Sequence, residues 1–358
     1  RALGLAAGSP LALACLRWHA SGWSAEESEA EAGPALPPER WHELRSLAER
    51  AALMPSGRID LDSIRRWHYE RGYRGAITLL EWPQDCAECF SRVTGVSDRE
   101  RHECYYVYYE LTGRGERLQQ IFIRGSCVPE DFLENALVAK VWDEELGCHL
   151  HHGFRRRAEQ VLGSLEPLLD RGAEITLSGH SLGGAVATIV GMRLLARGYN
   201  VREVVSFGAP KVTDRSGARR HPFRSHVLRI ATLLDPVPLL PFGFCTPFSG
   251  PFAQLGAQLL LLPGQPGDER DGPAISYLRP EAAAAPWITS FLLHARAPAL
   301  RRRGGSHGWL EPHRMRSYLR LLDPCAAAPH AVQRVPFGRR HALGRADAEG
   351  VPTMSCNT

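Results

Sequence analysis

The feature that most constrains this chain is a five-residue turn, Gly179-His180-Ser181-Leu182-Gly183, set between an apolar strand and an apolar helix. Residues 175–177 have the character of a short strand, and residues 182–197 carry small and apolar side chains up to Gly198, a helix stop signal. The pattern G-x-S-x-G in this context makes a strained turn, whose glycines lack the Cβ atoms that would collide. Such a turn exposes the serine hydroxyl at the top of a sheet, so we predict that Ser181 is a nucleophile.

Strands and helices alternate along the chain on both sides of this turn. Buried or alternating strand patterns occur at residues 105–109, 118–123, 204–207 and 227–231, the first two forming a predicted β-hairpin. Helical spacing of apolar residues occurs at residues 154–169 and 314–322. Because alternating strands and helices imply parallel strands with crossover helices, the sequence predicts an α/β fold with a mostly parallel central sheet and flanking helices.

A serine hydroxyl needs a base that removes its proton, and the base needs a carboxylate that orients it. In α/β-hydrolases the chain order is serine, acid, histidine. The best acid downstream of Ser181 is Asp235, just past a predicted strand, with Asp214 as the alternative. The histidine candidates are His221, His226, His294, His307 and His313. His313 and His307 lie late enough, on a loop before a helix, and we favour His313. The backbone N–H of Leu182 is placed to stabilise the oxyanion.

The order of these segments resembles the class 3 lipase family, the fungal lipase-like α/β-hydrolases, from about Tyr105 to Leu322. The family's elbow is matched by Gly179 to Ala185. The other matching segments are Ile123-Arg124-Gly125-Ser126, His152-Gly153-Phe154, Phe207-Gly208-Ala209-Pro210-Lys211-Val212, Asp235-Pro236-Val237-Pro238, and His313 with Tyr318 five residues later. The resemblance implies an oxyanion-hole role for Ser126. It also supports Asp235 over Asp214 and His313 over His307.

The predicted function is that of a serine acyl hydrolase, a lipase that cleaves ester bonds of glycerolipids such as triacylglycerols or phospholipids. A soluble carboxylesterase and a catalytically inactive lipid-binding member of the fold are the alternatives. The mechanism requires no metal and no organic cofactor. Lipid substrates also imply contact with a membrane or lipid-droplet surface. Two apolar segments are candidates for a cover over the site, residues 128–141 and the Phe-rich residues 239–252.

Charge and cysteine content exclude other classes of function. The net charge of +4 is too small to indicate nucleic-acid binding. Cys86 and Cys89 form a lone C-x-x-C pair, which lacks the second pair or the histidines of a structural zinc site. The nine cysteines are widely scattered, which favours an intracellular protein, in a plastid or at a membrane, over a secreted one.

The chain divides into four parts by composition. Residues 1–37 are predicted to be a flexible or targeting-related segment, and residues 38–100 a mostly helical extension. The lipase-like domain is expected over residues 101–324, followed by an irregular tail over residues 325–358. The apolar run at residues 2–16 is too short to span a membrane.

Overall fold

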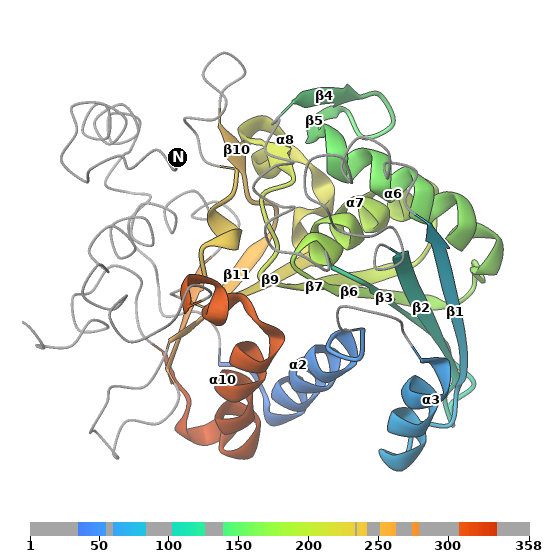
Figure 1. Cartoon of the computed structure of the whole chain (residues 1–358), viewed down its shortest axis with the longest axis vertical. Coiled ribbons are helices and arrows are strands. Elements are labelled where there is room, and N and C mark those ends of the chain that lie inside the picture. The colour runs from blue at the N-terminus through green and yellow to red at the C-terminus, as the bar shows by residue number, and fades with distance from the viewer. Residues whose placement is uncertain are drawn as a thin grey trace, which may run out of the picture.

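A central sheet with helices on both faces forms the fold (Figure 1). The structure, a computed structural model, describes residues 35–54, 60–83, 102–125, 139–232, 235–241, 251–262, 274–278 and 308–334. Within these residues, nine strands form the main sheet, in the order β1-β2-β3-β6-β7-β9-β11-β12-β13. Their bounds are β1 (Ala76–Pro83), β2 (His102–Leu111), β3 (Arg117–Ile123), β6 (Glu174–His180), β7 (Val201–Phe207), β9 (Val227–Thr232), β11 (Ala257–Leu262), β12 (Ala274–Leu278) and β13 (Gln333–Arg334).

The middle of the sheet is parallel. Strands β3, β6, β7, β9 and β11 run in one direction. Toward the edges, β1 with β2, β2 with β3 and β11 with β12 are antiparallel pairs, and β12 pairs parallel with β13. This confirms the predicted α/β fold with a mostly parallel central sheet, and also the predicted hairpin, which is formed by β2 and β3. Because the carboxyl ends of parallel strands meet at one edge, the segments that follow β6, β7 and β9 come together there.

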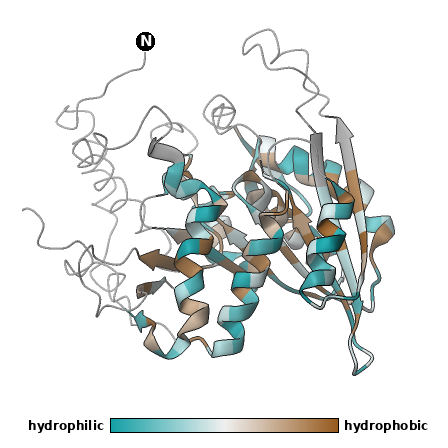
Figure 2. Cartoon of the chain, turned by 60° about the horizontal axis from the view of Figure 1, so that its bottom comes forward, coloured by the Kyte–Doolittle hydropathy of each residue, from teal (hydrophilic) through white to brown (hydrophobic). Residues whose placement is uncertain are grey.

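Helices cover the two faces of the sheet. On one face lie α6 (His152–Leu165), continued by η3 (Glu166–Leu168), and α7 (Leu182–Ala196); on the other lie α2 (Pro38–Ala51), α3 (Leu61–Glu70) and α10 (Met315–Ala327) (Figure 1). Each face has its own core, with Leu162 and Ile189 buried on the α6–α7 side and Trp41 and Leu322 on the α2–α10 side. In Figure 2 the α2–α10 side faces the viewer, and its helices carry mixed hydrophilic and hydrophobic faces, as amphipathic surface helices do.

A smaller sheet lies on the α6–α7 side of the main sheet, where Cys148 and Leu150 share the core of that side (Figure 1). It has the order β10-β8-β5-β4. Its strands are β4 (Lys140–Asp143), β5 (Cys148–His151), β8 (Thr213–Asp214) and β10 (Phe252–Ala253). Short helices complete the described chain, namely α8 (Arg215–Arg220), η4 (Pro222–His226), η5 (Val237–Leu239), η9 (Gly308–His313) and η10 (Pro329–Ala331).

The candidate cover segment at residues 128–141 ends in a strand rather than in a helix. Lys140 and Val141 belong to β4, which pairs antiparallel with β5 along four residues each. Hydrogen bonding to a partner strand overrides helical spacing here, because the apolar spacing of a short segment does not fix its structure. Residues 126–138, and the Phe-rich residues 242–250, lie outside the described part of the chain. Phe252 is buried in β10.

The structure adds facts that bear on the predicted division of the chain. The N-terminal extension contains α2 and α3 but also β1, which pairs with β2 from Ala76 to Pro83 and so belongs to the main sheet. At the other end, α10 runs through residue 324 to Ala327. Residues 1–34 and 335–358 lie outside the described residues, and the four-part division stays a prediction.

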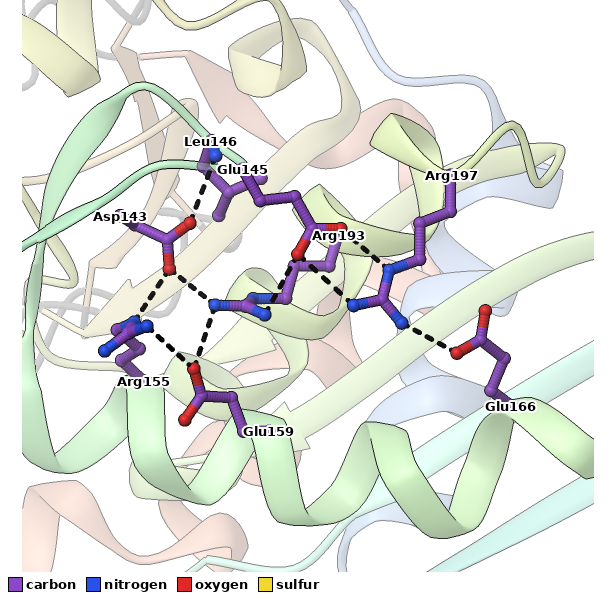
Figure 3. Close-up of polar contacts among 8 residues, drawn as sticks. All are labelled: Asp143, Glu145, Leu146, Arg155, Glu159, Glu166, Arg193 and Arg197. Atoms are coloured by element: carbon purple, nitrogen blue, oxygen red, sulfur yellow. Dashed lines mark hydrogen bonds and ion pairs between the residues drawn. The ribbon is translucent and has the colours of Figure 1, made fainter.

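An ion-pair network ties the β4–β5 hairpin to α6 and α7 (Figure 3). The buried carboxylate of Asp143 accepts hydrogen bonds from Arg155 at 2.9 Å, from Arg193 at 2.5 Å and from the Leu146 N–H at 3.1 Å. Burial acts to raise the pKa of Asp143, but the hydrogen bond from Arg155 and the charge of Arg193 outweigh it and hold that pKa below its usual value. Because α7 begins directly after Ser181, the network fixes the helix that supports the elbow.

Candidate active site

Ser181 lies at a sharp turn between β6 and α7. Its backbone has φ 55° and ψ −127°, and it is the one residue other than glycine with positive φ in the described part of the chain. Such a conformation is costly for an L-residue and persists only where its surroundings impose it. Here the Ser181 N–H donates to the Phe207 carbonyl at 2.8 Å, and a Cβ on Gly179 would lie 2.5 Å from the Gly183 carbonyl carbon. The glycines therefore permit the turn, as the sequence predicts.

His313 contacts Ser181 although the two residues are 132 positions apart in the sequence. It is the last residue of η9, and its Nε2 lies 2.8 Å from the Oγ of Ser181. Its Nδ1 lies 3.0 Å and 2.8 Å from the two carboxylate oxygens of Asp235. A carboxylate only accepts hydrogen bonds, so Nδ1 carries the proton and Nε2 is left to accept the serine hydroxyl. All three side chains are buried, with residues 181, 235 and 313 only 7%, 1% and 5% exposed.

Asp235 is held by two further donors. Its Oδ1 accepts the N–H of Val237 at 2.9 Å, and its Oδ2 accepts the hydroxyl of Tyr318 from the second turn of α10. Burial raises the pKa of Tyr318 well above its usual value, and the neighbouring Asp235 carboxylate raises it further. The phenol therefore remains a protonated donor. Sequence reasoning singled out Tyr318 only as a match to a family pattern and assigned it no role.

Gly208 closes the space behind the acid and the base. It follows β7 with φ +60°, and a Cβ at this position would lie 2.7 Å from Asp235 Oδ2 and 3.1 Å from His313 Nδ1. Both the backbone angle and the lack of room exclude larger residues. The glycine was visible in the sequence, but its contact with the acid could not be inferred without the fold.

His180 packs against the base. Its ring centroid lies 4.6 Å from that of His313, and its Nε2 lies 2.6 Å from the His313 backbone carbonyl oxygen. This contact could not be predicted from the sequence, because the pattern G-x-S-x-G leaves its second position, occupied by His180, open.

The predicted oxyanion-hole residues differ in how far the structure describes them. Leu182 is the first residue of α7, where backbone N–H groups have no intrahelical acceptor. Ser126 lies outside the described residues. The preceding Gly125 is described and lies against the elbow, since a Cβ there would be 2.6 Å from the His180 carbonyl oxygen and 3.4 Å from the Ser181 Cβ.

The alternative acid and two of the other candidate histidines, His221 and His226, lie apart from this cluster. Asp214 is the N-cap of α8, where its carboxylate accepts the Gly217 N–H at 2.7 Å. His221 caps η4, and His226 lies against the Arg202 carbonyl at 3.1 Å. The remaining candidates for a base or a metal site lie outside the described residues: His294, His307, Cys86 and Cys89.

Comparisons with known proteins show which proteins this chain is similar to. Residues 120–244 match the family model described as Lipase (class 3). Phospholipase A1-II 3 of Oryza sativa subsp. japonica is 32% identical over 145 residues, which cover 36% of this chain and 31% of the rice protein. The secreted mono- and diacylglycerol lipase 1 of Fusarium solani is 27% identical over 155 residues, covering 38% of this chain and 44% of that lipase. The chain therefore spans less than half the length of either relative.

A solved structure is similar at lower sequence identity. The crystal structure of a lipase from Rhizopus microsporus var. chinensis aligns with a TM-score of 0.48 and 16% identity, covering 72% of this chain and 85% of that one. The family match spans both β6 and α7, with Ser181 between them. Over residues 120–244, this chain is similar to the class 3 lipase family.

Proposed function

We propose that the chain is a serine acyl hydrolase that cleaves carboxylic ester bonds of glycerolipids, with Ser181, His313 and Asp235 as its catalytic residues. The observation that carries the proposal is the continuous hydrogen-bonded line from the Ser181 hydroxyl through both imidazole nitrogens of His313 to the Asp235 carboxylate. It is built on a strained elbow, which keeps the hydroxyl in place for attack.

In the proposed mechanism His313 takes the proton of Ser181 as its Oγ attacks the ester carbonyl carbon. Asp235 holds the imidazole in the Nδ1–H form and stabilises the imidazolium. The Leu182 N–H and Ser126 stabilise the tetrahedral oxyanion, and losing one such donor typically raises the barrier by about 3–4 kcal/mol. The imidazolium then protonates the leaving alcohol, and water, deprotonated by His313, hydrolyses the acyl-enzyme.

The choice of glycerolipid esters is supported by the printed names of the relatives, a phospholipase A1 and mono- and diacylglycerol lipases. We also propose peripheral contact with a lipid surface. Trp142 on β4 is 49% exposed, and an exposed tryptophan suits a membrane interface. In the described part of the chain, no helix has both the length and the apolar character needed to cross a bilayer. The intracellular location stays a prediction, since one named relative is a secreted fungal lipase.

Labelling with a fluorophosphonate probe tests the nucleophile. The wild-type chain should be labelled and Ser181→Ala should not, while the exposed Ser225→Ala serves as a matched control that labels normally. Equal labelling of Ser181→Ala and wild type would disprove the assignment of Ser181.

Substrate preference is tested with purified protein on an emulsified triacylglycerol, on phosphatidylcholine vesicles and on a soluble short-chain ester. The proposal expects release of fatty acid from at least one of the two lipids. Hydrolysis of the short ester alone would favour the carboxylesterase alternative. Labelling without turnover of any of these esters would contradict the lipase assignment.

A further inference from the structure

Two imidazole rings lie side by side at the candidate site. His180 is the last residue of β6, directly before Ser181, and the centroid of its ring lies 4.6 Å from that of His313, with the ring planes inclined by 32°. A second unprotonated imidazole beside the nucleophile raises the question of which ring accepts the proton. The hydrogen bonding and the charge of His180 answer it.

The hydrogen bond of His180 fixes its tautomer. Its Nε2 lies 2.6 Å from the backbone carbonyl oxygen of His313, and a carbonyl oxygen accepts hydrogen bonds but does not donate them. The proton of His180 therefore sits on Nε2, and Nδ1 has none as long as the ring is neutral. His180 thus acts as a donor toward the backbone of the residue whose side chain faces Ser181.

The surroundings of His180 keep its ring neutral. Burial lowers the pKa of His180 to about 3, and the nearby charge of His313 lowers it as well, against the smaller opposing effects of Asp235 and of the bond to the carbonyl. The ring of Tyr318, which faces His180 edge-on at 6.1 Å, also carries no charge. The carboxylate of Asp235 faces Nδ1 of His313, so His313 is the ring that gains the proton.

The hydrogen bond from His180 ties the backbone of His313 to the main sheet. His313 ends a short 3-10 segment that also bonds to α10, for example from the Ser317 hydroxyl to the Glu311 carbonyl at 2.8 Å. The bond from His180 joins this segment to the strand that carries the nucleophile, across a sequence separation of 133 residues. It therefore limits how far the His313 imidazole can shift from the Ser181 hydroxyl.

We propose that His180 is a positioning residue, which fixes the backbone of His313 relative to Ser181 through its Nε2–H hydrogen bond. This inference rests on the proposed serine hydrolase function. His180 acts through His313 and makes no bond to the substrate.

Kinetics of three variants test the proposal on a soluble short-chain ester. His180→Phe keeps a ring but loses the donor, and should lower kcat about tenfold, since displacements below 1 Å already slow such reactions. KM should change by less than about twofold, because His180 is not part of the substrate contact. His180→Gln restores an N–H donor and should recover most of kcat. His226→Gln is the matched control, since His226 also bonds a backbone carbonyl but lies outside the site.

Two kinetic results would overturn the proposal. One is a folded His180→Phe variant with kcat within about twofold of wild type, well short of the loss expected from misplacement. The other is a folded His180→Gln variant that is no faster than His180→Phe. Loss of ester hydrolysis in the wild-type chain itself would instead mean that the proposed function has failed.

A measurement that needs neither turnover nor a variant tests the proposal even if the wild-type chain hydrolyses no ester or a variant fails to fold. Histidine ¹⁵N NMR of the full chain should show His180 as the neutral Nε2–H tautomer between about pH 5 and pH 8, the range where an ordinary histidine titrates. A protonated ring, or a proton on Nδ1, would contradict the hydrogen bond to His313 on which the proposal depends.

Discussion

The hydroxyl of Tyr318 donates a hydrogen bond to Oδ2 of Asp235, the carboxylate oxygen that lies 2.8 Å from Nδ1 of His313. The acid of the candidate site is therefore shared between its base and a buried phenol. Because the side chain of Asp235 is enclosed, the loss of one donor cannot be replaced by bulk water without rearrangement.

Tyr318→Phe removes this donor and keeps the ring in its buried place. A hydrogen bond to a charged group is typically worth about 1.5–3 kcal/mol, so the orientation of Asp235 should loosen. We expect kcat on a soluble ester to fall about tenfold with little change in KM. Steady-state kinetics with circular dichroism as a check on folding would measure this. An unchanged kcat would show that the phenol contributes packing alone.

Asp235 and Asp214, the favoured and the alternative acid, can be compared by the same substitution to asparagine. Asp235→Asn should lower kcat by about 10⁴-fold, because the amide favours the wrong tautomer of the base. Asp214→Asn should leave kcat within about twofold, since asparagine caps a helix nearly as well as aspartate. The ratio of the two kcat values decides between them, and a larger loss at Asp214 would reverse the assignment of the acid.

Gly208→Ala places a methyl group 2.7 Å from Asp235 Oδ2, at a residue whose backbone φ is +60°. Acid and base must then move apart by several tenths of an ångström, and kcat should fall about 100-fold. Gly163→Ala in α6 is the control, because a Cβ there meets nothing within 4 Å. It should raise the free energy of unfolding by about 0.5–1 kcal/mol and leave kcat alone. Thermal unfolding and kinetics on both variants separate the effects.

The Asp143 network should make stability depend on acid pH. The pKa of Asp143 is lower in the folded chain than its ordinary value of 3.8, so its ionised form stabilises the fold above that value. The contribution disappears as pH falls below 3.8 through the lower pKa of the folded state. Tm of the wild type should therefore drop more steeply below about pH 4 than Tm of Asp143→Asn. Parallel slopes for the two proteins would contradict this.

At neutral pH the same substitution should be destabilising. Removing one charge of a buried pair typically costs about 3–5 kcal/mol, but Arg193 also bonds Glu145 at 3.0 Å and Glu159 at 3.2 Å. These partners keep the Arg193 charge paired, so we expect a loss at the lower end of that range. Denaturant unfolding at pH 7 measures it.

The residues brought together at the site could be predicted because short local patterns carry them. The elbow at Ser181 needs its own glycines, and Asp235 follows a strand whose end lies at the same edge of the sheet. Their catalytic roles stay a prediction. The contacts of His180 and Tyr318 could not be predicted, because each joins segments far apart in the chain and neither side chain carries a distinctive local signal.

The fold was predictable where periodicity was clear. Strand β11 was missed, because its run of leucines, Leu259 to Leu262, has no alternation and leucine favours helices as much as buried strands. Strand β1 was missed because its place in the sheet depends on pairing with β2 rather than on its own composition. Strand β4, which includes Val141, was missed for the same reason, since it is defined by its partner β5.

The packing of α2 against α10 has a consequence for any shortened form of this protein. Trp41 and Leu44 share a buried core with Tyr318 and Leu322, and Arg45 pairs with Asp323 at 2.6 Å. The helix that follows His313 thus rests on a helix from the opposite end of the sequence, and both lie beyond residues 120–244. A fragment trimmed to residues 120–244 would keep Ser181 but lose His313 and the two helices, α2 and α10, that pack together behind it. Under the proposed function, the smallest unit that keeps Ser181, His313 and the helices that support them extends from α2 to α10.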